Sequence, residues 1–380
     1  MTNPRICLTI DWYLPGTNSG GPVRSVANLV AAMPGVDFYI ITRNTDYCST
    51  EPYVGIESNV WVQADTNVRV CYLEDSQISK QKIQELILES GAQTLYISGI
   101  YSKAFSQWPV SIGKALKLKT VVAARGMLSP HALAVKPIKK YLFLSFMRWL
   151  NAYSHVHFHA TSEKEASDIK KVLGTNTNVK VVSNLGRLEF IEPQPIDKTP
   201  QSLKLVSIGR IAPEKGTIVG LKALQAVKGN ITFDLYGTAY NSSYWEECKQ
   251  MIGRLPSNIT VRHHGPCPTE AVAAKLSAAH ALLLPSEGEN YGHSIVESLA
   301  QGRPVLISKH TPWQNLAAQK AGWDVSATEL LSAIQTLVEM DQAVYQTWSE
   351  GAKNYHQMVI EEEQENTIGA YKKLFFASNK

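Results

Sequence analysis

The feature that most constrains this chain is a repeated alternation of short apolar runs with amphipathic segments. In the first half, the predicted strands share their shortness and near-continuous apolar character: 5–10, 37–42, 68–73, 94–98, 120–124, 155–161 and 179–182. Segments with helical spacing lie between most of them, including 23–33, 79–90 and 162–173. Such alternation is typical of a parallel sheet covered by helices on both faces.

The same alternation restarts after a proline-rich segment, LEFIEPQPIDKTPQS. The second set of predicted strands is 203–209, 231–237, 259–265, 280–286 and 304–308. The pattern predicts an N-terminal domain (1–187), a linker (188–202) and a second domain (203–355). A C-terminal helix (356–380) could pack back on the first domain. The predicted fold is α/β, with two tandem doubly wound Rossmann-like domains facing across a cleft and a helical C-terminus. Ligands of such sheets bind at the carboxyl ends of the strands.

Composition narrows the class of protein. Apolar residues make up 44% and charged residues 18% of the 380 residues, which is typical of a globular protein. The net charge of +4 is small and too diffusely distributed to predict nucleic-acid binding. The five cysteines form no CxxC pair and no Cys/His pair at zinc spacing, so we expect no zinc site, and we expect no cofactor. Short apolar runs at the N-terminus and elsewhere predict a cytoplasmic protein without a signal peptide or membrane span.

Two glutamates bracket a glycine in GENYGHSIVE, residues 288–297. Glu289 follows an apolar strand, and Glu297 falls more than a turn into the next predicted helix. The first-turn amides of 292–295 would lack helical partners and could bind phosphate, while carboxylates on either side suit sugar hydroxyls. The pattern indicates a nucleotide-sugar site, although an ordinary strand-to-helix turn with two solvated acids fits it too.

Two further turns could serve the same ligand. In SIGRIAPEKG, Arg210 and Lys215 follow the first strand of the second domain and could clamp a diphosphate; two surface cations are the plain alternative. In the first domain, Gly20 and Gly21 open a helix after the first strand and would let the backbone approach a ligand. This turn is not a clean G-x-G-x-x-G, and a simple tight connection explains it equally.

Together these motifs resemble the retaining glycosyltransferases of the GT-B fold, in family 4 of the sequence-based classification. GRIAPEKG (209–216) and PSEGENYGHSIVE (285–297) match the family's two motifs, including its E-x7-E spacing, and the Gly-Gly turn also matches. The resemblance covers nearly the whole chain, and Tyr291 stands where phenylalanine is commoner.

The resemblance implies a role for each matched residue. Arg210 and Lys215 would neutralise the donor diphosphate, and Glu289 would hold hydroxyls of the donor sugar. Glu297 would bind the ribose. The remaining implied donor contacts are Gly292, His293 and Ser294. Gly20 and Gly21 would approach the donor phosphate or the acceptor from the other domain. The partners implied are a nucleotide-diphosphate sugar and a glycan or lipid-linked acceptor, with no metal.

One stretch departs from the family pattern. Many members carry a histidine after the strand matching 120–124, whereas this chain has Arg125 there, with His131 further on. The form RGMLSPHAL resembles bacterial surface-polysaccharide transferases, which implies that Arg125 contacts the sugar or acceptor and that His131 lies on the acceptor side. Alternatively, Arg125 pairs with an acid and His131 caps a helix.

A basic, aromatic segment, 136–153, could lie on a membrane surface and place the protein peripherally on the inner face of the plasma membrane. The alternative, favoured by its place between two predicted strands, is a helix whose wide apolar face is core.

The leading hypothesis is a retaining glycosyltransferase in the synthesis of bacterial cell-surface polysaccharide, such as lipopolysaccharide or capsule. The alternatives are a nucleotide-sugar epimerase of the same fold, a sugar phosphorylase, or an inactive nucleotide-sugar-binding subunit. Acceptor-dependent product formation separates the first from the others.

Overall fold

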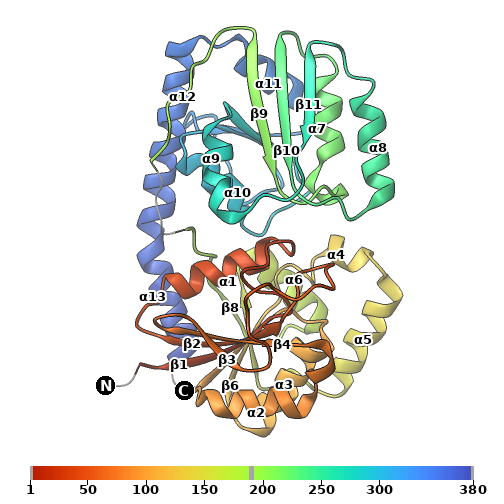
Figure 1. Cartoon of the computed structure of the whole chain (residues 1–380), viewed down its shortest axis with the longest axis vertical. Coiled ribbons are helices and arrows are strands. Elements are labelled where there is room, and N and C mark those ends of the chain that lie inside the picture. Colours follow the sequence, from red (N-terminus) through yellow and green to blue (C-terminus); the bar gives the residue numbers. More distant parts are fainter. Residues whose placement is uncertain (1–2, 188–191, 378–380) are drawn as a thin grey trace. The chain divides into compact units, whose positions relative to one another are not determined.

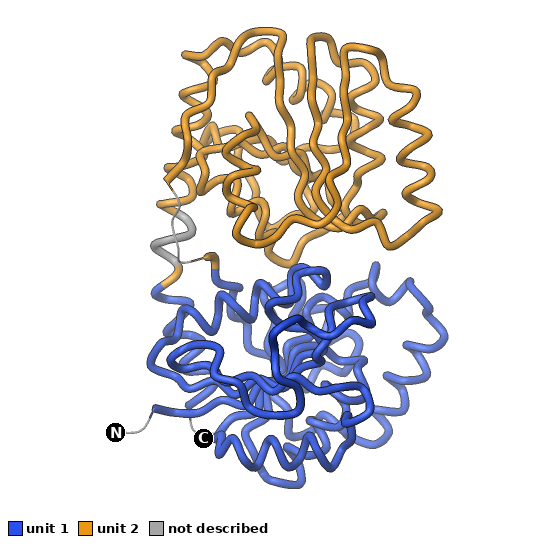
Figure 2. Tube along the Cα trace, in the orientation of Figure 1, with its two compact units in different colours: residues 1–185, 365–380 blue, residues 186–364 orange. Residues whose placement is uncertain are grey.

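The chain folds into two compact units in a computed structural model that describes residues 3–187 and 192–377. Unit 1 consists of residues 1–185 and 365–380, and unit 2 of residues 186–364 (Figure 2). The first four residues of the predicted linker, 188–191, lie outside the described residues. Each unit has one mainly parallel sheet with helices on both faces, so the predicted α/β class with two doubly wound domains is confirmed (Figure 1).

The sheet of unit 1 has the strand order β3-β4-β2-β1-β5-β6-β7-β8 in the described part of the chain. The strands are β1 (Arg5–Thr9), β2 (Asp37–Arg43), β3 (Trp61–Asp65), β4 (Val68–Leu73), β5 (Thr94–Ser98), β6 (Lys119–Ala123), β7 (Val156–Ala160) and β8 (Val179–Val181). All pairs are parallel except β3, which runs antiparallel to β4 at the edge. The sequence prediction of a parallel sheet missed this strand, because a half-exposed edge strand such as WVQAD lacks a continuous apolar run.

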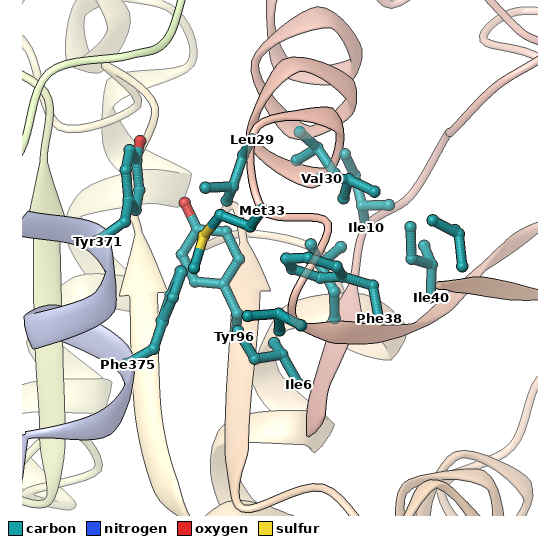
Figure 3. Packing of buried hydrophobic residues seen from close by; sticks show 14 of the residues in the cluster. Ile6, Ile10, Leu29, Val30, Met33, Phe38, Ile40, Tyr96, Tyr371 and Phe375 are labelled. Atoms are coloured by element: carbon teal, nitrogen blue, oxygen red, sulfur yellow. The ribbon is translucent and has the colours of Figure 1, made fainter. Parts of the chain in front are cut away.

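Helices cover both faces of this sheet. They are α1 (Gly21–Ala31), α2 (Lys80–Ser90), α3 (Trp108–Ala115), α4 (Pro130–Ala134), α5 (Pro137–Trp149), α6 (Glu163–Leu173) and α13 (Glu362–Phe376). Successive strand residues point to opposite faces, so Ile6 packs in the cluster of α1 and α13, whereas Cys7 packs in that of α2, α3 and α6. Figure 3 shows Tyr371 and Phe375 of α13 packed beside Tyr96 of β5. The C-terminal helix therefore supplies part of the core of unit 1.

Helix α5 contradicts the interpretation of 136–153 as a helix with a wide core face. Leu144 and Met147 are buried, but Ile138, Leu142 and Trp149 are exposed. A narrow stripe holds the helix to unit 1, and most of its apolar surface points away from that core.

The sheet of unit 2 has the order β11-β10-β9-β12-β13-β14, and every pair in it is parallel among the described residues. Its strands are β9 (Ser202–Ile208), β10 (Asn230–Tyr236), β11 (Ile259–His263), β12 (Ala281–Leu284), β13 (Val305–Ser308) and β14 (Gly322–Val325). Its helices are α7 (Thr217–Leu224), α8 (Ser242–Ile252), α9 (Val272–Ser277), α10 (His293–Ala300), α11 (Leu330–Glu339) and α12 (Gln342–Tyr355). One face is covered by α7, α8 and α11 and the other by α9, α10 and α12. The short edge strand β14 was not predicted.

A buried cation fastens the described part of the linker to unit 2. Lys198 is 2% exposed, and its Nζ donates to the carbonyl oxygens of Thr199, Val338 and Met340 at 2.9, 3.2 and 2.8 Å. Two of these carbonyls belong to the end of α11, where carbonyls lack helical partners. The linker from residue 192 onward is thus part of unit 2 rather than a free tether.

A buried histidine lies beside the same linker. His280 Nε2 donates to the carbonyl of Asp197 at 2.9 Å, and His280 Nδ1 accepts from the Lys204 amide at 2.8 Å. Burial, helped by the nearby cations Lys198, Lys204 and Arg303, lowers the pKa of His280 to about 4. The neutral ring with its proton on Nε2 is therefore the form that fits this position.

Candidate functional site

The candidate donor site lies at the carboxyl ends of two neighbouring strands of unit 2. Strands β9 and β12 pair in parallel, with Leu205 opposite Ala281. The loops that follow them therefore emerge at the same edge of the sheet, and they are joined by the Glu287 amide, which donates to the Glu214 carbonyl at 2.9 Å. These loops carry GRIAPEKG and GENYGHSIVE, so sheet topology brings the two motifs together.

An ion pair connects the two motifs. Lys215 Nζ lies 2.6 Å from Glu289 Oε1, and the two side chains are 22% and 10% exposed. The sequence interpretation assigned these residues to different parts of the ligand and did not foresee their contact. A charge-assisted hydrogen bond at this burial orients both side chains before any ligand arrives.

The glycine after Lys215 is required by close packing of the two loops. Gly216 has φ +69°, and a Cβ at this position would lie 2.0 Å from the carbonyl oxygen of Pro285. No other residue type fits without moving one loop. The backbone that carries Lys215 is therefore pressed against the start of the Glu289 loop.

Arg210, the other predicted cation, has a different partner. Its Nη2 lies 3.3 Å from Glu214 Oε1, and both side chains are about one-third exposed, at 40% and 33%. The salt bridge is solvent-accessible and contributes little to stability. Arg210 can therefore exchange Glu214 for an incoming anion at small cost.

Helix α10 begins at the predicted anion site. Gly292 is its N-cap in the left-handed region, with φ +80°, and a Cβ there would lie 3.6 Å from Glu289 Cγ. The Glu289 side chain thus lies near the N-terminus of this helix, whose first residues His293 and Ser294 are buried. One prediction is corrected: the Ile295 amide donates to the Gly292 carbonyl at 2.8 Å, so it is not among the amides left for an anion.

Glu297 is placed on the same helix, further from its start. Its side chain is partly exposed, whereas its neighbours Val296 and Ser298 are buried. Helical geometry points Glu297 away from the core, as a ligand-binding acid requires. Which group it binds stays a prediction.

An aromatic cluster that the sequence reasoning missed supports the loop between the two acids. Trp313 Nε1 donates to the Tyr291 carbonyl, and its ring meets the Tyr291 ring edge-on at 5.5 Å. Tyr291 in turn lies 4.9 Å from the His293 ring. Nothing in the local pattern signalled Trp313, because it reaches the loop from beyond β13.

In unit 1, Gly20 and Gly21 begin α1. Gly20 is the N-cap with φ +76°, and a Cβ at either glycine would meet no atom within 4 Å. The loop before them is held by Asp46, whose carboxylate accepts from the amides of Thr17 and Asn18 at 3.0 and 3.1 Å. The open space at both glycines leaves the backbone accessible; contact with a donor or acceptor stays a prediction.

Arg125 follows β6 and heads a buried polar chain in unit 1. Its Nη1 donates to Asn184 Oδ1 at 2.7 Å and its Nη2 to the Tyr96 hydroxyl at 2.9 Å. The Tyr96 hydroxyl lies 2.9 Å from His159 Nδ1, whose ring bonds the Val182 carbonyl through Nε2 at 2.8 Å. These partners of Arg125 are neutral, which corrects the alternative in which it pairs with an acid.

Burial determines which atoms donate and accept in the hydrogen bonds that link Arg125, Tyr96 and His159. Burial and the Arg125 charge lower the pKa of His159 to about 3, so its Nδ1 accepts the Tyr96 proton and leaves the phenol oxygen as acceptor for Arg125. Arg125 itself has φ +53°, and the amide of the next residue, Gly126, donates to the buried Glu165 carboxylate at 2.6 Å. The turn is thereby locked, and Arg125 is a fixed cation.

His131 lies in α4 and is exposed. The residue that caps α4 is Ser129, whose side chain accepts from the Ala132 amide. The alternative in which His131 caps a helix is therefore wrong. A role on the acceptor side stays a prediction.

Comparison with known proteins identifies the architecture. Residues 168–355 match the family model described as glycosyl transferases group 1. Among solved structures with the same fold are sucrose-phosphate synthase from Thermosynechococcus elongatus (17% identity, TM-score 0.69, 99% of this chain and 100% of that one) and WaaG, titled as a glycosyltransferase involved in lipopolysaccharide biosynthesis (14%, 0.69, 98% and 100%). Anabaena HepE in complex with UDP and glucose has 15% identity and a TM-score of 0.71 over 98% of this chain and 100% of its own.

A curated relative is also similar in sequence. It is WcaL of Escherichia coli strain K12, named as a colanic acid biosynthesis glycosyltransferase, and it is 25% identical over 169 residues. The match spans 42% of this chain and 42% of WcaL, so less than half of that relative's length is covered.

These findings bear on the class of protein. The fold is GT-B, and the family match covers both motifs of the candidate site in unit 2. The comparisons therefore support an enzyme of the glycosyltransferase class.

The structure also bears on metals and membranes. No cluster of three or more histidine, cysteine or acidic residues suited to a metal ion occurs among the residues that the structure describes. Across residues 3–187 and 192–377, no helix combines the length and apolar character needed to span a bilayer.

Proposed function

We propose that this protein is a retaining glycosyltransferase of family 4, which moves a sugar from a nucleotide-diphosphate donor to a glycan or lipid-linked acceptor in the synthesis of bacterial cell-surface polysaccharide. The observation that carries the proposal is the Lys215–Glu289 pair, held between the carboxyl ends of β9 and β12 at the N-terminus of α10. A cation, a carboxylate and a helix N-terminus at one point match the phosphate and hydroxyl groups of a nucleotide-sugar.

The roles divide along the ligand. Lys215, Arg210 and the first amides of α10, with Gly292, His293 and Ser294, bind the diphosphate. Glu289 accepts hydrogen bonds from hydroxyls of the transferred sugar, and Glu297 accepts them from the ribose. When the donor binds, Lys215 turns from the Glu289 carboxylate toward a phosphate oxygen. Glu289 then accepts hydrogen bonds from sugar hydroxyls in place of the lysine.

The reaction is a substitution at the anomeric carbon. The bond from that carbon to the diphosphate oxygen breaks, and a bond to the acceptor oxygen forms on the same face. The acceptor proton passes to the departing phosphate oxygen, so the products are the glycosylated acceptor and a nucleoside diphosphate. The charge that develops on the diphosphate is stabilised by Lys215, Arg210 and the helix amides, and such preorganised electrostatics is commonly the largest catalytic term.

The residues of unit 1 serve the acceptor in this proposal. Arg125 supplies a fixed cation for the sugar or acceptor, and His131 lies on the acceptor side. Gly20 and Gly21 expose backbone for the donor phosphate or the acceptor.

The first test is calorimetric titration of the purified protein with UDP, GDP, ADP and CDP, without added metal and then with magnesium. We expect one nucleoside diphosphate to bind without metal and Glu297→Ala to weaken it. The control is Glu350→Ala on α12, which removes an exposed acid of the same unit. Absence of binding by all four, with or without magnesium, would reject the donor site.

Turnover then separates this function from its alternatives. With the matching nucleotide-sugar, product that forms only when a glycan acceptor is present, with the donor's anomeric configuration by NMR, supports a retaining transferase. Conversion of the donor without acceptor would indicate an epimerase. Nucleotide binding without turnover for every acceptor offered would indicate a binding subunit.

A further inference from the structure

Helix α5 presents an apolar face that nothing in unit 1 covers. Ile138, Tyr141, Leu142, Phe146 and Trp149 are 75%, 72%, 62%, 54% and 79% exposed. At 100° per residue these five positions fall within one continuous arc of the helix. Figure 1 shows α5, in yellow, as an outlying helix at the margin of unit 1.

The opposite face of α5 is firmly attached. Leu144 is buried in a core cluster of unit 1, and Met147 is buried as well. Lys140 Nζ lies 5.2 Å from the centre of the Tyr101 ring, and Phe143 meets that ring edge-on at 5.6 Å. The exposed face is therefore presented in a fixed orientation, and rotating it inward would unseat these contacts.

The charge around this face has one sign. Lys139 and Arg148 lie on either side of the apolar arc by the same helical geometry, and Lys136 precedes the helix. No aspartate or glutamate occurs between residues 126 and 162. Cations that flank an apolar, aromatic stripe are the arrangement of helices that lie in the interface of an anionic bilayer.

We propose that the outer face of α5 docks on an anionic lipid surface, with Trp149, Leu142 and Ile138 inserted and Lys139 and Arg148 at the level of the headgroups. The positive charge of the segment favours lipid over a second copy of the chain, because two such faces would bring like charges together. Docking adds to the proposed function a route to a lipid-linked acceptor, and it rests on that function only for its purpose. The docking itself is measurable without donor, acceptor or turnover.

The test is flotation of the full chain with vesicles of phosphatidylcholine alone or with about one-third phosphatidylglycerol, an amount that gives a strongly negative surface. We expect binding to the anionic vesicles, and loss of most of it when salt is raised to about 0.5 M and the Debye length falls to a few ångströms. Leu142→Ser with Trp149→Ser should weaken binding roughly 25-fold through lost apolar burial. Lys139→Gln with Arg148→Gln should weaken it by a similar factor of roughly 25 through lost attraction to the surface.

Matched controls isolate the face. Val54→Ser removes an apolar side chain that is 99% exposed elsewhere in unit 1, and Lys309→Gln with Lys320→Gln removes two exposed cations of unit 2. Neither should change vesicle binding, and every variant should keep the circular dichroism spectrum of the parent chain.

Three outcomes would overturn the proposal. They are no binding to anionic vesicles, equal loss of binding in the control variants, and self-association in analytical ultracentrifugation that the Leu142→Ser, Trp149→Ser variant abolishes. Failure of the transferase proposal would show instead as absent nucleotide binding with vesicle binding intact, so the two proposals fail separately.

Discussion

The contact between Lys215 and Glu289 makes a quantitative prediction, because the chain contains a second ion pair of the same length. Lys249 and Glu246 of α8 are also 2.6 Å apart, but they are 48% and 62% exposed, against 22% and 10% for the loop pair. The two ion pairs therefore have the same length and differ in how deeply their side chains are buried.

The expected energies follow from that difference. At 2.6 Å and an effective dielectric constant of about 20, the gross Coulomb attraction is about 6 kcal/mol, and desolvation cancels most of it. We expect a net coupling of about 2 kcal/mol for the Lys215–Glu289 pair, since removing one partner leaves the other charge mostly buried and unpaired. The exposed pair should couple by about 0.3 kcal/mol, as helix surface pairs do.

A double-mutant cycle measures both couplings. The variants are Lys215→Met, Glu289→Gln and their combination, with Lys249→Met, Glu246→Gln and their combination as the control cycle. The free energy of unfolding is taken from equilibrium urea titration followed by tryptophan fluorescence. Equal couplings in the two cycles would refute the inference that burial makes the Lys215–Glu289 pair a preorganised element of the proposed donor site.

Three further predictions concern the same unit. Glu297→Ala should weaken nucleoside diphosphate binding about tenfold by removing a ribose acceptor, whereas Glu289→Ala should leave that binding largely intact and abolish transfer, as calorimetry and a product assay would show. His280 has a lowered pKa of about 4, so between pH 6.5 and 4 the unfolded chain binds more protons than the folded one. The free energy of unfolding should therefore fall by up to about 3 kcal/mol as pH drops through that range. Urea titrations at several pH values should show a shallower fall for the His280→Gln variant. Gly216→Ala places a Cβ 2.0 Å from the Pro285 carbonyl oxygen and should cost about 2–4 kcal/mol of unfolding free energy, read as a lower melting temperature.

Each of these has a control and a contrary result. Glu350→Ala is the control for the Glu289 and Glu297 variants. If Glu289→Ala and Glu297→Ala lost nucleotide affinity equally, the two acids would not have the separate roles proposed. For the histidine, an unchanged pH dependence in His280→Gln would mean that other groups titrate. For the glycine, Gly369→Ala is the match, since a Cβ at Gly369 would meet no atom within 4 Å, and equal melting temperatures of the two variants would contradict the steric argument.

Much of the fold was predictable because its signals are local. Twelve strands of the two sheets coincide with apolar runs of the sequence to within a few residues, as at 68–73 and 94–98. The missed strands, β3 and β14, are short edge strands with exposed or mixed residues. In both strands, exposed or polar side chains interrupt the continuous apolar run that marks a central strand.

The candidate site was predictable in part for a topological reason. Loops after parallel strands gather at one edge of a sheet, so residues placed just after predicted strands, such as Arg210 and Glu289, could be assigned to a site before their contacts were known. Their partners could not be assigned. The residues that hold the site residues in place, such as Trp313 and the Tyr96–His159 pair, are far from them in sequence. A buried tyrosine or histidine also looks the same in sequence whether it fills the core or positions a neighbour.

The sequence by itself determined the two α/β units and the turns that carry the motifs of the candidate donor site, because periodicity and glycine placement act over a few residues. Tertiary structure alone decided that Lys215 meets Glu289, 74 residues away, that Arg125 is bound by neutral oxygens rather than an acid, and that the apolar side of α5 faces outward. These depend on strand order and on which helix face finds a neighbour, and neither is encoded in any short stretch of the chain.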